Sequence, residues 1–88
     1  MNLTNDFTVT KLADEYVAVP MNNMERFNGV IKLNESGAEI FQGLIEGQEE
    51  QQLVKRLMEK YPELDLKTAE DAVAQVLNDL KNAKVLEA

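Results

Sequence analysis

The sequence predicts an α+β fold in which a three-stranded antiparallel sheet is followed by three helices. Up to Leu33 the apolar residues form short runs with a period of two, whereas from Glu35 onwards they recur with a helical period. Pro20, Gly47 and Pro62 separate these runs, as residues that end strands and helices do. Strands gathered in one part of a chain and helices in the other are typical of the α+β class.

The predicted sheet lies within residues 7–33. The alternation of apolar and polar residues and the turn signal Ala13-Asp14 predict a hairpin, and Asn28-Gly29 predicts a second turn. Met21–Phe27 is polar and irregular, so we expect a loop there. The three strands are expected at Phe7–Leu12, Glu15–Val19 and Val30–Leu33.

The predicted helices lie within residues 35–83. Asn34 precedes the first helix, and its side-chain oxygen can accept from the free N–H groups of the first turn. Gly47 and Pro62 end the first two helices, and Thr68 opens a Thr-Ala-Glu-Asp run that resembles a capping box. Val85-Leu86 is expected to add a short final segment to the core. The helices are expected at Glu35–Glu46, Glu49–Lys60 and Thr68–Asn82.

Composition excludes several function classes. The 88 residues suit one domain, 1–88, with a core too small for a large cofactor pocket. The chain has no His and no Cys, which removes the commonest general base, the commonest metal ligand and zinc–thiolate sites. We therefore expect no catalytic residue, no metal and no cofactor. The absence of a long apolar run or a signal peptide predicts a cytoplasmic protein with no membrane partner.

The net charge of −7 is unevenly distributed. Residues 1–34 carry four acids and three bases, whereas the rest of the chain carries twelve acids and six bases. The helical half is therefore the acidic half, and it would repel a phosphate backbone. Nucleic acid is not expected as a partner.

The order and spacing of apolar positions over residues 7–87 resemble the pyrroloquinoline-quinone biosynthesis protein D family. The matching features are Leu33-Asn34-Glu35, Ala38, Ile40-Phe41, Glu46-Gly47, Leu53, Leu57, Leu80 and Val85-Leu86. The resemblance implies a winged-helix-like domain that binds the leader of a ribosomally made precursor peptide. Such a domain presents the peptide to a modifying enzyme, often a radical S-adenosylmethionine protein.

The resemblance also implies where the leader binds: it adds as a strand to Val30–Leu33 and lies beside the third helix. An edge strand offers unpaired N–H and C=O groups for such addition. On a helical wheel, the apolar stripe of the third helix centres near Ala69, Val76 and Leu80 and leaves Leu77 on one flank. The candidate peptide-binding residues are therefore Val30, Ile31, Lys32, Leu33, Glu70, Ala74, Leu77 and Lys81.

Two alternatives from other function classes stay open. A winged-helix DNA-binding regulator would need a basic third helix, and this region carries three acids against Lys81 and Lys84. A plain oligomerisation or scaffolding domain would pair the same strand edge with its own copy and form a homodimer. The apolar residues of Val30–Leu33 would equally suit a covered core strand. A molecular mass that rises with protein concentration would indicate self-pairing rather than peptide binding.

Overall fold

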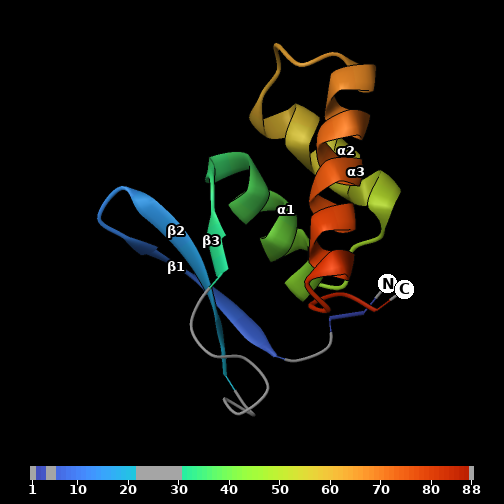
Figure 1. Cartoon of the computed structure of the whole chain (residues 1–88). Coiled ribbons are helices and arrows are strands. Elements are labelled where there is room, and N and C mark those ends of the chain that lie inside the picture. Colours follow the sequence, from blue (N-terminus) through green and yellow to red (C-terminus); the bar gives the residue numbers. More distant parts are fainter. Residues whose placement is uncertain (1, 4–5, 22–30, 88) are drawn as a thin grey trace.

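A computed structural model shows three strands followed by three helices, as the sequence predicts (Figure 1). It describes residues 2–3, 6–21 and 31–87, so Val30 and all but Met21 of the predicted loop Met21–Phe27 lie outside the described residues. The strands form one antiparallel sheet of order β1-β2-β3. The elements are β1 (Phe7–Leu12), β2 (Glu15–Pro20), β3 (Ile31–Leu33), α1 (Glu35–Ile45), α2 (Glu50–Lys60) and α3 (Leu66–Asn82).

One face of the sheet packs against the helices. The register pairs Ala18 with both Val9 and Ile31, so these three side chains share that face. Ala18 is fully buried, and the other two side chains pack partly buried against the same core. Phe7 from β1 meets Phe41 from α1 edge to face, with 5.4 Å between ring centroids and an interplanar angle of 83°. α1 is therefore the helix that joins the sheet to the rest of the core.

α1 begins where β3 ends, with one residue between them. That residue is Asn34, whose Oδ1 accepts from the backbone N–H of Gly37 at 2.7 Å, which confirms the predicted cap. Further along α1, Gly43 lets α2 approach closely, because a Cβ at this position would clash with the side chain of Leu53. The start of α1 is thus fixed by the Asn34 cap beside the sheet, and its later turns are fixed by the close contact with α2.

α3 begins earlier than the sequence analysis predicted. Its cap is Asp65, whose carboxylate accepts from the backbone N–H of Thr68 at 2.8 Å. The assignment of Thr68 as the cap is wrong, because Leu66 and Lys67 already belong to the helix and Thr68 lies in its first turn. Hydrogen bonds from the side chain and backbone of Thr68 lower the pKa of Asp65 below its ordinary value.

The two ends of the described chain lie side by side (Figure 1). Leu3 and Leu86 form an isolated antiparallel bridge, and the N–H of Glu87 donates to the carbonyl of Asn2 at 2.8 Å. Val85 and Leu86 are buried in the core, so the predicted final segment is confirmed. Its pairing with residues 2–3 was not predicted.

We expect Asp65→Ala to lower the melting temperature more than Thr68→Ala does. The first variant removes the acceptor for the free N–H groups of α3, whereas the second keeps the backbone N–H that the carboxylate binds. Because the pKa of Asp65 is lowered in the folded state, its stabilisation is present at neutral pH and is lost as the pH falls through that pKa. Thermal melts of both variants at neutral and acidic pH measure this. A larger loss in Thr68→Ala would contradict the assigned cap.

Candidate functional site

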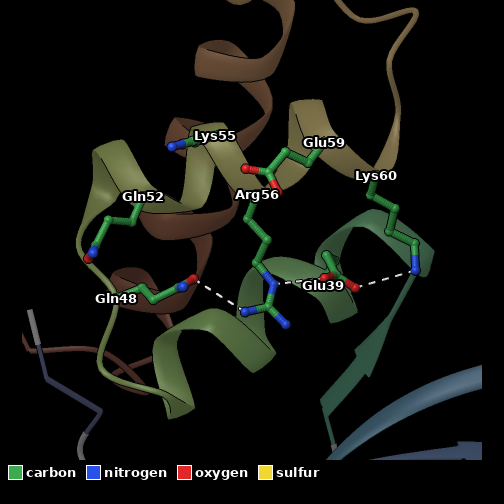
Figure 2. A pocket seen from close by; sticks show the side chains of 7 residues that line it. All are labelled: Glu39, Gln48, Gln52, Lys55, Arg56, Glu59 and Lys60. Carbon is green, nitrogen blue, oxygen red and sulfur yellow. Dashed lines mark hydrogen bonds and ion pairs between the residues drawn. The ribbon is translucent and has the colours of Figure 1, made fainter.

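The first depression on the described surface is a charged pocket of about 740 Å³ between α1 and α2 (Figure 2). Arg56 lies at its centre. Its Nε donates to Glu39 Oε1 at 2.7 Å, and its Nη1 donates to Glu46 Oε1 at 3.0 Å. Lys60 Nζ lies 3.4 Å from the other oxygen of Glu39. The remaining lining residues are Gln48, Gln52, Lys55 and Glu59.

The ion pairs of this pocket stabilise the α1–α2 contact. Burial alone would raise the pKa of Glu39, but the hydrogen bond and charge of Arg56, with help from Lys60, outweigh it and lower that pKa. The hydrogen bond from Arg56 also lowers the pKa of Glu46. The guanidinium of Arg56 is thus already paired with two carboxylates of the same chain. We therefore interpret the pocket as part of the α1–α2 contact rather than as an anion-binding site.

The second depression is a groove of about 440 Å³ between β3 and α3. Apolar side chains from both elements line it, and Lys32, Gln75 and Asp79 add polar groups. Gln75 donates through Nε2 to Asp79 Oδ1 at 2.9 Å, so these two side chains are tied together one helical turn apart. The lining residues are Ile31, Lys32, Leu33, Asn34, Gly37, Gln75, Val76, Asp79, Leu80, Ala83 and Val85.

The outer edge of β3 borders this groove. β3 pairs with β2 on one side, and in the described part of the chain no other strand pairs with its second side. Ile31 and Leu33 are half-buried towards the core, while Lys32 is exposed. An apolar groove beside a strand edge can hold an extended peptide, because the edge supplies hydrogen-bonding groups and the groove holds alternate side chains.

The structure brings together only part of the predicted site. Ile31, Lys32 and Leu33 line the groove, and Val30 lies outside the described residues. Leu77 is 4% exposed and belongs to the core, so it does not line this groove. The other predicted helix residues, Glu70, Ala74 and Lys81, are exposed and do not line the groove.

The difference between the predicted residues and the groove residues comes from the position of the buried stripe on α3. Ala69, Val73, Leu77 and Leu80 are buried, whereas Val76 is only partly buried. The stripe therefore centres near Val73 rather than near Ala69, Val76 and Leu80, and β3 lies beside the flank opposite the one that was chosen. Sequence reasoning missed Gln75, Val76 and Asp79 as groove residues, although an apolar Val76 at the edge of the stripe that borders Gln75 and Asp79 was a usable signal.

Metal clusters and membrane-spanning helices are not found in the described residues. Residues 2–3, 6–21 and 31–87 contain no group of three or more His, Cys, Asp or Glu side chains that could hold a metal ion. Within the same ranges, every helix is too short or too polar to cross a membrane.

Comparisons with known proteins identify a family from the sequence and a shared fold from solved structures. A family model described as Coenzyme PQQ synthesis protein D (PqqD) matches residues 15–86. Among solved structures, TbiB1 in complex with the TbiA(beta) leader peptide is 23% identical, with 100% of this chain and 96% of that chain covered and a TM-score of 0.77. Lasso peptide synthetase B1 complexed with the leader peptide is 22% identical, with coverage of 99% and 96% and a TM-score of 0.76. No curated protein matches this chain.

We expect Arg56→Met to lower the free energy of unfolding by about 1–2 kcal/mol at pH 7, since it keeps an apolar stem but removes the hydrogen bonds to two carboxylates. Because the pKa of Glu39 is lowered, this stabilisation is present above the ordinary carboxyl pKa and is lost as the pH falls through the lowered value. Urea unfolding at neutral and acidic pH measures both effects.

Lys67→Met is the matched control for this experiment. Lys67 lies 3.6 Å from Asp71 with both side chains largely exposed, so its loss should cost less than about 0.5 kcal/mol. Equal losses in the two variants would show that the Arg56 cluster is no stronger than an ordinary surface pair.

Proposed function

Because this chain belongs to the Coenzyme PQQ synthesis protein D (PqqD) family, we propose that it is a non-catalytic adaptor for a ribosomally made precursor peptide. The leader of the peptide binds in the groove between β3 and α3, and the adaptor presents the rest of the peptide to a modifying enzyme. The observation that carries the proposal is the groove itself, which lies beside a strand edge with no partner in the described chain. The two solved proteins of the same fold are complexes with leader peptides.

Strand addition alone would bind a leader weakly. In the described residues β3 spans Ile31–Leu33, and alternate residues of an antiparallel strand direct their N–H and C=O groups to opposite edges. At most two of these three residues therefore pair with the leader, which gives on the order of 2–6 kcal/mol from four hydrogen bonds. Association costs about 4–15 kcal/mol in lost freedom. Apolar contacts in the groove, with Leu33 and Val76 as the central pair, must supply the remainder.

The adaptor acts by raising the concentration of the peptide near the active site of its partner. The family resemblance makes a radical S-adenosylmethionine enzyme the first class to test as that partner. The adaptor and the modifying enzyme need only a weak direct contact. The peptide already links them, because the adaptor binds its leader and the enzyme binds its core. The modification rate at low peptide concentration is the quantity that the adaptor should increase.

We expect Val76→Glu to weaken leader binding about 10- to 100-fold, or roughly 1.4–2.8 kcal/mol, because it places a charge against the apolar wall of the groove. The ligand is a synthetic leader from a precursor peptide sought among the neighbouring genes, and fluorescence anisotropy measures the affinity. Ala74→Glu is the matched control, since the exposed Ala74 lies on the far flank of α3 and should leave the affinity unchanged. Sedimentation at the same concentrations shows whether copies of the chain pair with each other instead.

The same pair of variants can contradict the proposal. If Ala74→Glu weakens binding and Val76→Glu does not, the leader binds the flank that the sequence analysis chose. If no leader binds at any concentration that keeps the protein monomeric, the adaptor function is wrong.

We expect no specific complex with duplex DNA near physiological salt. α3 carries three acids and two lysines, and its exposed Glu70, Asp71 and Asp79 would face any phosphate backbone that approached it. Gel shifts against random and genomic fragments test this. A nanomolar complex with one sequence would favour the regulator function instead.

A further inference from the structure

A third cavity, of about 460 Å³, lies where α2, the segment between α2 and α3, and the start of α1 meet. We call it the corner pocket. Its apolar walls are Leu57, Tyr61, Leu64 and Ala72, and more of its lining is apolar than polar. The other lining residues are Asn34, Glu35, Ser36, Glu63 and Thr68.

The corner pocket continues the groove described above. Asn34 lines both cavities, because it stands between the end of β3 and the first turn of α1. Along α3, Thr68, Ala72 and Val76 are spaced four residues apart and therefore share one face of the helix. The first two line the corner pocket and the third lines the groove. A peptide that leaves the edge of β3 near Leu33 thus meets the corner pocket next.

The wall of the corner pocket is held in place before any ligand arrives. The hydroxyl of Tyr61 donates to Glu35 Oε1 at 2.8 Å, which ties the end of α2 to the first turn of α1. Burial and this hydrogen bond raise the pKa of Tyr61 to about 12, so the donor stays protonated at neutral pH. The N–H of Leu64 donates to the carbonyl of Tyr61 at 3.0 Å, which positions the second apolar wall. A preorganised pocket loses little freedom when it binds.

We propose that the corner pocket binds one large apolar side chain of the leader, next to a cationic residue that Glu35 and Glu63 attract. The inference rests on the proposed function, because it assigns the occupant to the same peptide. If the leader extends the antiparallel sheet, it runs opposite to β3, so this side chain precedes the residues that pair with Ile31–Leu33. The pocket would then set which leaders bind, while the strand edge accepts many sequences.

The first experiment needs no natural ligand. N-acetyl-L-phenylalanine amide is titrated into the whole chain at millimolar concentrations and followed by amide NMR, with N-acetylglycine amide as the matched probe without a side chain. We expect the phenylalanine probe to shift the amides of Tyr61, Leu64 and Ala72, and the glycine probe to shift none of them. Shifts confined to other residues, or no shift from the phenylalanine probe, would overturn the proposal.

Two variants make this result specific. Ala72→Arg fills the corner pocket and should weaken the phenylalanine probe at least tenfold, whereas Ala74→Arg, on the far flank of α3, should leave it unchanged. Should Ala72→Arg fail to fold, Thr68→Arg blocks the opening from an exposed position and should give the same loss. Unchanged probe affinity in the folded blocking variant would overturn the assignment.

The synthetic leader then separates this inference from the function on which it rests. We expect Ala72→Arg to weaken the leader at least tenfold, and replacement by Ala of one apolar leader residue before the paired stretch to do the same. Suppose that the leader shifts the amide signals of Ile31–Leu33 and loses affinity in Val76→Glu but not in Ala72→Arg. That result would overturn the corner-pocket inference and leave the adaptor function standing. A phenylalanine probe that binds the pocket while no leader binds would overturn the adaptor function and the leader as occupant.

Discussion

The burial of α1 between the sheet and the other two helices is the constraint on which the rest of the structure depends. Phe41 and Ile40 are almost completely buried, and Phe41 contacts Phe7 of β1 on one side of the helix. On the other side, Gly43 brings α2 close enough for Leu53 to pack against the backbone of α1. A helix enclosed in this way cannot shift without opening the core, because protein interiors are close-packed. The elements that pack on α1 or connect directly to it therefore have fixed positions relative to it.

β3 is joined to α1 through Asn34 alone, and this short connection explains the groove. The cap fixes the direction in which the chain leaves the strand, so the edge of β3 cannot turn towards α3 and close the space between them. α3 packs its buried stripe on α1 and α2 and leaves Val76 at the border of that stripe. The groove is thus the space left between β3, which Asn34 connects to α1, and α3, which packs on α1 and α2. Exposed residues of α3 give the groove its polar rim.

The sequence predicted the elements well because local signals were strong where the chain changes structure. The alternation in Phe7–Leu12, the cap at Asn34 and the stop at Gly47 each act through nearby backbone geometry. The start of α3 was missed because Asp65 and Thr68 are both good caps three residues apart, and Leu66, 55% exposed, gives no periodic signal. The groove residues of α3 were not predicted because a helical wheel gives two flanks of the stripe, and only the tertiary position of β3 decides which flank borders the groove. The bridge of Leu3 with Leu86 joins residues too distant in sequence for any local pattern.

That bridge has a mechanical consequence. With residues 2–3 paired to residues 86–87, a force that pulls on both ends of the described chain loads this pairing and the buried Val85 and Leu86 first, because they are the contacts nearest to both ends. The groove and the sheet edge therefore lie outside the direct path of tension. For the same reason, the neighbouring ends can be joined by a short linker and the chain reopened elsewhere with little change to the core. The bridge of Leu3 with Leu86 thus closes the described chain at its two ends, and the proposed binding surface lies away from this bridge.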